Sequence, residues 1–119
     1  MGEENLNLNE LVINGVVYTV KLDRPLHPYV IVRTYSAGVF AGYLESRNGQ
    51  EVVLRKSRRI WQWVGAASLS QLAQSGTSKP KECKFPEEVD RIELLQAIEI
   101  LDVTDQAKKL IASVPVWKQ

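Results

Sequence analysis

The stretch YVIVRTYSAGVFAGYLESRNGQEVVLRKSRR, residues 29–59, decides the fold of this chain. It contains three runs rich in β-branched and aromatic residues, and such runs are typical of β-strands. Ser36-Ala37-Gly38 separates the first two runs, and a turn with the pair Asn48-Gly49 separates the last two. Asn-Gly between apolar runs is the strongest short signal for a hairpin, so the stretch predicts an antiparallel meander. The predicted strands are Tyr29–Tyr35, Val39–Glu45 and Glu51–Arg55.

A second Asn-Gly pair precedes this meander. Asn14-Gly15 lies between the apolar runs Leu11–Ile13 and Val16–Val20, which predicts one more hairpin. The polar residues 1–10 are expected to form a flexible lead, and residues 23–28 a connector, because the two prolines there cannot donate to a strand ladder. A chain of 119 residues has room for one core. We therefore expect residues 11–119 to form a single domain.

The residues directly after the meander predict a bulge and a further strand. Lys56-Ser57 is expected to form a bulge or a corner, and Arg58–Trp63 a short strand. Side chains alternate between the two faces of a strand, which would place Arg59, Trp61 and Trp63 on one face.

A helix is expected next, beginning at Ala67 or Ser68 and ending at Gly76, a residue type favoured just past a helix C-terminus. Residues 77–86, which are rich in lysine, are expected to form a loop. Residues 89–103 fit both a strand period and a helix period. Their β-branched content favours a strand.

The C-terminal residues predict a second helix, Thr104–Ser113, with Thr104 as its N-cap and an acid in its first turn. Val114–Trp117 is expected to form a short last strand. The predicted fold class is α+β, a mainly antiparallel sheet of short strands with two short helices.

Composition excludes several classes of protein. The net charge is +1, although residues 21–63 hold eight bases against three acids, so an anionic partner is expected in the middle of the chain. No apolar run approaches the roughly 20 residues that span a bilayer, and the acidic N-terminus lacks the pattern of a signal peptide. We expect no membrane contact, and nucleic acid is a poor partner for a nearly neutral chain.

Motifs of enzymes and metal sites are missing from the sequence. It has no P-loop, dinucleotide fingerprint, nucleophile elbow or HExxH helix. One cysteine, Cys83, and one histidine, His27, give no disulfide and no zinc spacing, and a catalytic pair of the two is disfavoured. We expect a protein that is not an enzyme, with no catalytic residue, no metal and no cofactor.

The richest stretch in chemical terms is RKSRRIWQWVGAASLS, residues 55–70. Arginine forks bind phosphate in a bidentate manner, which makes Arg55, Arg58 and Arg59 candidate phosphate ligands. An aromatic face such as that of Trp61 can stack on a nucleobase. Ser68 and the neighbouring amides at a helix start attract anions. Together these groups predict a pocket for a nucleotide.

A structural interpretation of the same residues stays open. The tryptophans can be core residues, because indoles bury a large area. The arginines can form a solvated strand edge that discourages aggregation, and Ser68 can be an ordinary helix cap.

A second candidate site is the stretch Arg33 to Gly38. Arg33 and Tyr35 share a strand face beside a turn that bears Ser36, and a hydroxyl–glycine turn can present N–H groups to an oxyanion. The alternative is that Arg33 and Tyr35 stack on each other on a solvated face.

Several stretches together resemble a known family. They are YVIVRTYSAGVFAGYLE, EVVLRKSRRIWQW, GAASLSQLAQSGTSKPKECKFP and VTDQAKKLI, spread over residues 29–117. They resemble a family of small proteins encoded by bacteriophages and prophages and catalogued as a domain of unknown function. The resemblance implies a phage-type source and kinship of fold, but no reaction. Because the single cysteine forms no internal disulfide, we expect a reducing cytoplasm, that of the bacterial host.

By analogy with small phage proteins that sequester signalling nucleotides, we expect a sponge-type protein. It would bind a cyclic or phosphorylated nucleotide of host immunity without cleaving it. Three tryptophans in so small a chain predict that a partner subunit covers apolar surface, and hence a homo-oligomer. The alternative function is a virion accessory or interaction module that acts on a host protein.

Overall fold

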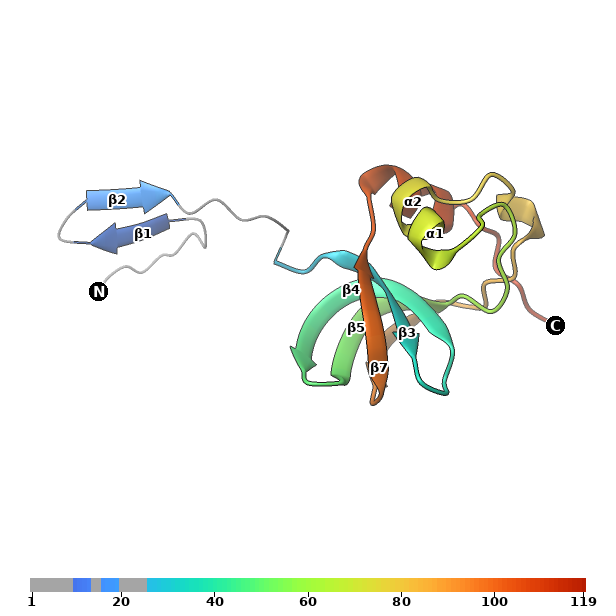
Figure 1. Cartoon of the computed structure of the whole chain (residues 1–119), viewed down its shortest axis with the longest axis horizontal. Coiled ribbons are helices and arrows are strands. Elements are labelled where there is room, and N and C mark those ends of the chain that lie inside the picture. The colour runs from blue at the N-terminus through green and yellow to red at the C-terminus, as the bar shows by residue number, and fades with distance from the viewer. Residues whose placement is uncertain (1–9, 14–15, 20–25) are drawn as a thin grey trace.

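The computed structural model describes the backbone of residues 10–13 and 16–19 and all of residues 26–119 (Figure 1). The strands are β1 Glu10–Ile13, β2 Val16–Thr19, β3 Tyr29–Thr34, β4 Val39–Asn48, β5 Glu51–Arg59, β6 Val89–Leu94 and β7 Ala97–Asp102. The helices are α1 Leu69–Ser75, the short 3-10 helix η1 Pro80–Glu82 and α2 Asp105–Ala112.

The strands form an α+β fold of the predicted class, in which antiparallel sheet predominates. Strand β1 pairs with β2, from Glu10 opposite Thr19 to Ile13 opposite Val16, which confirms the first hairpin. The predicted lead up to residue 9, the turn at residues 14–15 and most of the connector lie outside the described residues. No helix in the described part of the chain is long and apolar enough to cross a membrane.

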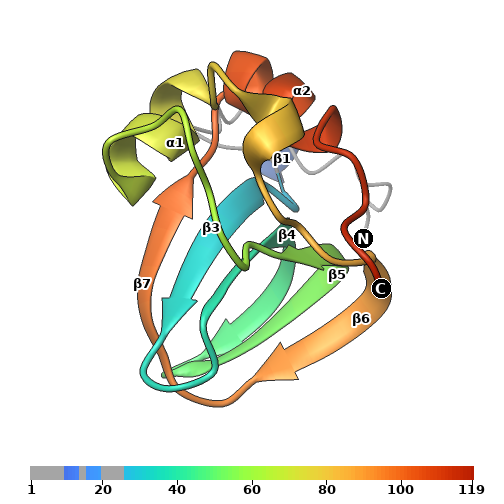
Figure 2. The ribbon, with the colours of Figure 1, turned by 90° about the vertical axis from the view of Figure 1, so that its right-hand side faces the viewer.

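The main sheet has the order β6-β5-β4-β3-β7, and every neighbouring pair is antiparallel. Its two edge strands, β6 and β7, are joined by only Leu95 and Gln96. A two-residue connection between opposite edges requires the sheet to curl until those edges approach. Figure 2 shows this curl, with α1 and α2 together on one side of the sheet.

Side-chain alternation divides the apolar residues between the two faces of the curled sheet. One face forms the inner cluster, enclosed by the curl: Val30, Val32, Phe40, Val52, Leu54, Leu94 and Ala97. The other face packs against the helices and the loops beside them and forms the helix-side cluster: Ile31, Ala41, Ile60, Leu72, Ala73, Cys83, Phe85, Ile111 and Val114. The fold therefore has two small cores, one on each face of a single sheet.

Strand β5 contains the predicted bulge. Lys56 has a φ of 53°, and the pairing with β4 passes from Tyr43 opposite Arg55 to Ala41 opposite Arg58. Two residues of β5 therefore lie opposite the single residue Gly42, which is the definition of a β-bulge.

The two α-helices have the predicted caps. Ser68 Oγ accepts the Gln71 N–H at 3.1 Å, and Gly76, with a φ of 75°, closes α1. Thr104 Oγ1 accepts the Ala107 N–H at 3.1 Å and donates to Gln74 O at 2.8 Å. The N-cap of α2 therefore also ties α2 to the last turn of α1.

Three expectations about the strands are corrected. Residues 89–103 are not one strand but two, β6 and β7, which lie at opposite edges of the main sheet. The predicted strand Arg58–Trp63 is wrong, because Arg58 and Arg59 still belong to β5 and the chain then leaves the sheet. Beyond Ile60 it bonds instead to the loop at Lys84.

The third correction concerns Val114–Trp117, which is not a strand. It makes one isolated parallel bridge, Phe85 with Val116. Trp117 N–H also donates to Phe85 O at 3.0 Å. Local β-propensity predicted a strand here, but this segment lies against a loop, which offers it no continuous ladder.

Candidate functional site

Arg58, the central arginine of the predicted phosphate site, is a structural residue. Its side chain is 6% exposed. The guanidinium donates to Phe85 O and Val114 O at 2.9 Å each. Three longer bonds, of 3.3 to 3.4 Å, reach the carbonyls of Ile111, Pro115 and Pro86. Burial lowers the pKa of Arg58, and no N–H of its fork is left to grip a phosphate.

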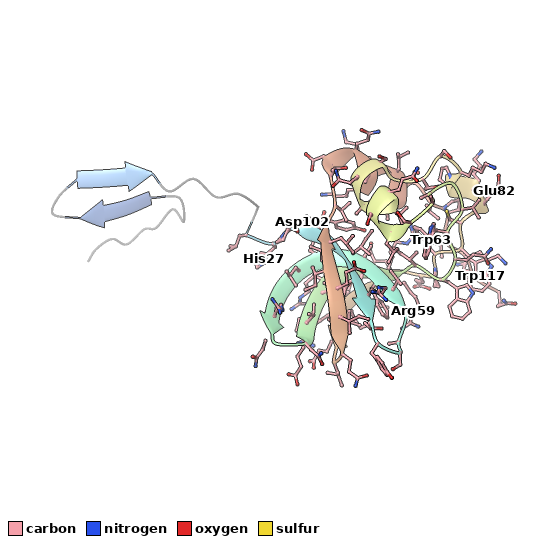
Figure 3. All side chains as sticks on the ribbon, viewed as in Figure 1. His27, Arg59, Trp63, Glu82, Asp102 and Trp117 are labelled. Carbon is pink, nitrogen blue, oxygen red and sulfur yellow. The ribbon has the colours of Figure 1, made fainter. Side chains whose placement is uncertain are left out.

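The other two arginines of the predicted site lie apart from each other. Arg55 is exposed and donates to Glu45, and this hydrogen bond lowers the pKa of the Glu45 carboxyl. Arg59 lies on the inner side of the sheet, 4.6 Å from the centroid of the Phe40 ring (Figure 3). Adjacent residues of a strand point to opposite faces, which separates Arg58 from Arg59, so the three guanidinium groups do not converge.

The tryptophans and Ser68 also separate. Trp61 is 62% exposed and stacks on Trp117, with ring centroids 6.3 Å apart and planes 12° apart. Trp63 is half-buried against the helix-side cluster, and its indole N–H donates to Ala66 O. The prediction that the two indoles share a face with Arg59 is therefore wrong. The Ser68 oxygen caps α1, as the structural interpretation holds.

The second predicted site, at the turn between β3 and β4, is bound to its own neighbours. Arg33 Nε donates to Glu99 Oε1 at 2.9 Å, and Tyr35 is 76% exposed. Thr34, which the sequence did not single out, closes the turn. Its Oγ1 donates to Gly38 O and accepts the Ala37 N–H. Ser36 is exposed at the tip.

A different set of residues converges on a hollow between the sheet and α2, with a volume of about 370 Å³. Its residues come from β3, β4, β5, α2 and the segments before β6 and after α2. We call it the tyrosine–lysine hollow; it is lined by Tyr29, Tyr43, Lys56, Arg58, Glu88, Lys108, Ala112, Val114 and Val116.

The floor of the tyrosine–lysine hollow contains a pair of phenol rings. Tyr29 and Tyr43 are opposite each other on β3 and β4, and their rings meet edge to face with centroids 5.1 Å apart. Lys108 of α2 holds its Nζ 4.9 Å from the Tyr43 centroid and 5.7 Å from that of Tyr29. A cation above aromatic faces is attracted by their negative quadrupole, which holds the ammonium at the hollow.

The electrostatics of the tyrosine–lysine hollow favour an anion. Three cations and one carboxylate line it. Lys56 reaches it from the bulge of β5, in a left-handed conformation that is unusual for a residue with a Cβ. Such strain in the backbone is concentrated at functional sites.

Tyr29 remains a neutral phenol over the physiological range. Burial raises the pKa of Tyr29 to about 12, an effect that nearby Arg58 partly opposes and that Tyr43 and Glu88 reinforce. A group with such a pKa is a hydrogen-bond donor at neutral pH and is poorly matched to proton abstraction.

Sequence reasoning missed most of this hollow. Lys56 lies within the basic run that the sequence singled out, but Tyr29, Tyr43 and Lys108 did not stand out. The two tyrosines do occupy the outward, helix-facing positions of adjacent strands, a signal visible once the register is known. No pattern in a single sequence pairs them with a lysine on the last helix.

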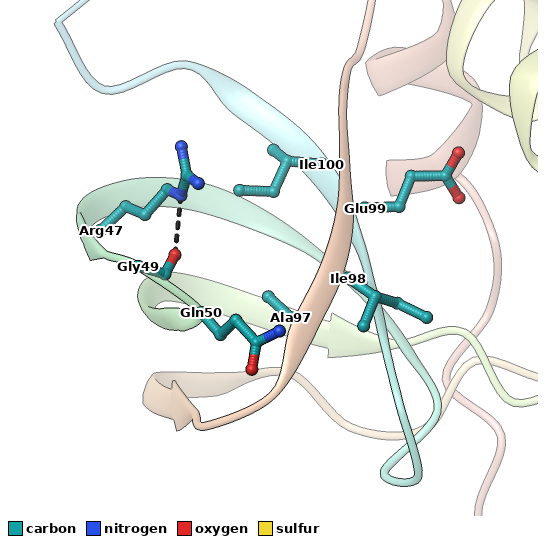
Figure 4. A pocket seen from close by; sticks show the side chains of 7 residues that line it. All are labelled: Arg47, Gly49, Gln50, Ala97, Ile98, Glu99 and Ile100. Atoms are coloured by element: carbon teal, nitrogen blue, oxygen red, sulfur yellow. Dashed lines mark hydrogen bonds between the residues drawn. The ribbon is translucent and has the colours of Figure 1, made fainter.

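A larger hollow, of about 490 Å³, lies between the turn of β4 and β5 and strand β7 (Figure 4). Arg47 on its rim donates to Gly49 O of the same turn. Ile98 and Glu99 point to the other side of β7 (Figure 4), and Glu99 is paired with Arg33. Its polar groups therefore diverge, which makes it a weaker candidate site. Among the described residues, no three His, Cys, Asp or Glu side chains are grouped to hold a metal ion.

The fold defines the class of this molecule as a small α+β domain built on one curled, five-stranded antiparallel sheet. The chain belongs to the family described as Domain of unknown function (DUF6948), which matches residues 27–111. No curated protein and no solved structure matches it. The family match confirms the resemblance to a domain of unknown function and begins two residues before Tyr29.

Proposed function

We propose that this protein binds a small phosphorylated compound with an aromatic ring, a nucleotide, in the tyrosine–lysine hollow and does not transform it. The observation that carries the proposal is the convergence of Lys56 and Lys108 on the Tyr29–Tyr43 pair, from elements far apart in the sequence. The two ammonium groups would neutralise phosphate, and a phenol ring would contact the base.

The size of the hollow narrows the ligand class. A volume of about 370 Å³ is near the lower end of the roughly 300–1,000 Å³ typical of small-molecule sites. It suits one nucleotide unit. A cyclic dinucleotide would need two such hollows side by side, and hence the homo-oligomer that the sequence predicts.

Binding without turnover is supported by the groups that line the hollow. They include one carboxylate, Glu88, and neither histidine nor cysteine. Tyr29 keeps its proton at neutral pH, and the fork of Arg58 is occupied by backbone carbonyls. A general acid–base pair of matched pKa, which hydrolysis of a phosphate ester would use, is therefore not assembled from these lining residues.

The phage-type sponge role rests on the resemblance and on analogy. Capture of an immune nucleotide in the host cytoplasm would be one use of such a hollow, because sequestration requires affinity and no chemistry. We keep this role as the finer form of the proposal.

Calorimetry on the full chain tests the proposal, with nucleoside monophosphates, cyclic mononucleotides, cyclic dinucleotides and cyclic ADP-ribose isomers as ligands. We expect at least one to bind with a dissociation constant below about 0.1 mM, and Lys56→Gln and Lys108→Gln each to weaken it about tenfold. Lys109→Gln, exposed next to Lys108 on α2, is the matched control and should change affinity less than twofold.

Two results would contradict the nucleotide proposal. One is the absence of heat and of any thermal shift with every ligand at millimolar concentration, because a ligand of the native state must raise its stability. The other is binding that both lysine variants leave unchanged, which would place the nucleotide elsewhere on the molecule.

A second candidate function, an interaction module acting on a host protein, is favoured by the exposed Trp61–Trp117 stack. Trp61 is 62% and Val116 50% exposed, and exposed aromatic patches are enriched at interfaces. This function predicts that one bacterial protein is retained by the full chain and lost with Trp61→Arg, while nucleotide binding is unchanged. Equal retention by both chains would count against it.

A further inference from the structure

A third hollow opens at one end of the curled sheet, where the inner cluster reaches the surface. Its volume is about 160 Å³. We call it the sheet-mouth hollow, and it is lined by Phe40, Ser57, Arg59, Pro86, Glu87, Val89 and Ile92. It lies on the inner face, whereas the tyrosine–lysine hollow lies on the helix side. The mouth of a curled or closed sheet is a common place for a small-molecule site.

Ser57 points to a ligand in the sheet-mouth hollow. Its side chain is 1% exposed, and its Oγ has no hydrogen-bond partner in the described structure. The large majority of buried side-chain polar atoms in proteins have a partner, so each exception needs a physical reason. A bound acceptor would give the Ser57 hydroxyl the partner that the chain itself does not supply.

Arg59 supplies a cation at the same hollow. Its guanidinium lies 4.6 Å from the centroid of the Phe40 ring. No carboxylate pairs with it among the described residues, whereas Arg33, Arg55 and Arg91 each have a glutamate partner. Arg59 therefore retains a free fork of donors for an anion.

Ser57 and Arg59 are suitably spaced to hold one carboxylate. They are two residues apart on the same face of β5, so their Cα atoms lie about 6–7 Å apart. A carboxylate can accept from donors on both sides, with hydrogen bonds of about 2.7–2.9 Å. Both donors would then be satisfied by one group.

The rest of the hollow selects a short aliphatic tail. Phe40, Val89 and Ile92 provide apolar walls. A volume of 160 Å³ holds roughly five waters at about 30 Å³ each, which limits a ligand to about six non-hydrogen atoms. Glu87 on the rim repels a second negative charge, so a diacid is disfavoured.

We propose that the sheet-mouth hollow binds a short-chain monocarboxylate, with the carboxylate between Ser57 and Arg59 and the aliphatic tail against Phe40. This site is independent of the nucleotide proposal, because the two hollows share no lining residue and occupy opposite faces of the sheet.

The test is a titration of the full chain with sodium butyrate, followed by amide shifts in heteronuclear NMR spectra. Butyrate should give saturable shifts at Ser57, Arg59 and Val89, with a dissociation constant in the millimolar range. Butylammonium chloride, which has a similar tail and the opposite charge, should give none. Sodium succinate, a diacid, should bind at least threefold more weakly than butyrate.

Variants separate a ligand-binding role from a structural one. Arg59→Gln should lower the affinity for butyrate at least tenfold. Glu87→Gln should raise this affinity two- to fivefold, because it removes the repulsion between the two carboxylates. Ser57→Ala should weaken it about threefold while leaving the melting temperature unchanged or raised, because the lost hydroxyl has no partner in the protein. Arg91→Gln, an arginine on the opposite face of β6 from Ile92, should have no effect.

Three outcomes would overturn the proposal. The first is shifts that rise linearly with butyrate and never saturate. The second is equal affinity of the Arg59→Gln and unchanged proteins. The third is a fall in melting temperature with Ser57→Ala at unchanged butyrate affinity, which would give the hydroxyl a purely structural role.

Discussion

Arg58 illustrates how a residue type that is favoured for phosphate binding can become part of the framework. It lies directly after the bulge, where its side chain points toward the helix side of the sheet. There it meets the carbonyls that end α2 and those of the loop at Phe85. Carbonyl oxygens in a buried site need donors, and one guanidinium satisfies several of them at once.

We predict that Arg58→Met lowers the free energy of unfolding by about 2–4 kcal/mol. The substitution leaves the carbonyls of Phe85 and Val114 without their charged donor, and each such loss costs about 1–3 kcal/mol. Urea denaturation measures the change. Arg55→Gln, which removes an exposed pair with Glu45, should cost less than about 1 kcal/mol. Equal effects of the two variants would contradict the structural role of Arg58.

The phenol of Tyr29 makes stability depend on alkaline pH. Its pKa is raised to about 12 in the folded protein, while an unfolded tyrosine has a pKa near 10. Between these values the unfolded chain has released the proton and the folded chain has kept it. The free energy of unfolding therefore falls as pH rises from about 10 to 12, with a slope of at most about 1.4 kcal/mol per pH unit.

We predict that Tyr29→Phe removes this fall, because phenylalanine has no proton to lose. Chemical denaturation at pH 9, 10, 11 and about 12 measures it. Tyr35→Phe, at an exposed tyrosine in the turn after β3, is the control and should leave the pH profile unchanged. Parallel profiles for the unchanged protein and Tyr29→Phe would contradict the prediction.

The bulge in β5 determines which side chains each face of the sheet receives. Without the extra residue at Lys56, strict alternation would send Arg58 into the inner cluster and Arg59 toward the helices. With it, Arg58 reaches the C-terminal carbonyls, Ser57 and Arg59 face the sheet-mouth hollow, and Lys56 borders the tyrosine–lysine hollow. One irregular residue therefore shapes both candidate sites.

Gly42 makes this bulge possible. A Cβ at Gly42 would lie 2.9 Å from Arg55 O and 3.1 Å from the Cα of Ser57, both backbone atoms that have little room to move. We predict that Gly42→Ala lowers the free energy of unfolding by about 1–3 kcal/mol through this overpacking. Denaturation in urea measures it. The control is Ala41→Gly at the neighbouring buried position. It changes the side chain by the same single methyl group, but it removes the group and so creates no close contact.

The Gly42→Ala variant should also bind any ligand of the tyrosine–lysine hollow more weakly, because a displaced bulge moves Lys56. A Gly42→Ala protein with unchanged stability and unchanged amide shifts at Lys56 would contradict this prediction. It would show that the bulge does not need the close approach of Gly42 to the backbone of Arg55 and Ser57.

The two clusters that hold the molecule together draw on β3 and on residues after it. Among residues 26–119, whose side chains the structure describes, every buried member lies between Val30 and Val114. The family match over residues 27–111 covers nearly the same range. Within residues 26–119, the curled sheet and its helices thus hold the fold together, and Arg58 holds the C-terminal segment.

We predict that a chain of residues 26–119 folds alone, with a melting temperature within about 5 °C of the full chain, which corresponds to about 1 kcal/mol in a domain of this size. A chain that ends at Ala112 should melt at least about 10 °C lower. It loses the buried side chain of Val114 and also Val114 O, to which Arg58 donates at 2.9 Å. Calorimetry of both chains measures these shifts. A large loss for the first chain would contradict the prediction.

Most elements could be predicted from the sequence because their signals are local. The hairpin turns, the helix caps at Ser68 and Thr104 and the bulge after Arg55 depend on residues a few positions apart. The strand expected for Arg58–Trp63 failed because a tertiary contact with Lys84 replaced the ladder. Val114–Trp117 failed for the same reason, because propensity does not show which neighbour a segment will meet.

The candidate sites were less predictable than the elements. The sequence identified the right chemistry, cations beside aromatic rings, but grouped residues by proximity in the chain. Adjacent strand residues point to opposite faces, which separated Arg58 from Arg59. Trp61 lies beyond the end of β5 and is exposed. The lysines and tyrosines that do converge belong to separate elements, so only their packing brings them together.

The sequence by itself thus determined the class of fold, the turns, the helix caps and the bulge, since each follows from steric preferences of residues close in the chain. Only the tertiary structure decided which face each cation occupies and which partners it meets. The physical reason is that burial and hydrogen bonding depend on contacts between distant segments. These contacts assigned Arg58 to the framework and left Lys56, Lys108 and Arg59 beside the hollows.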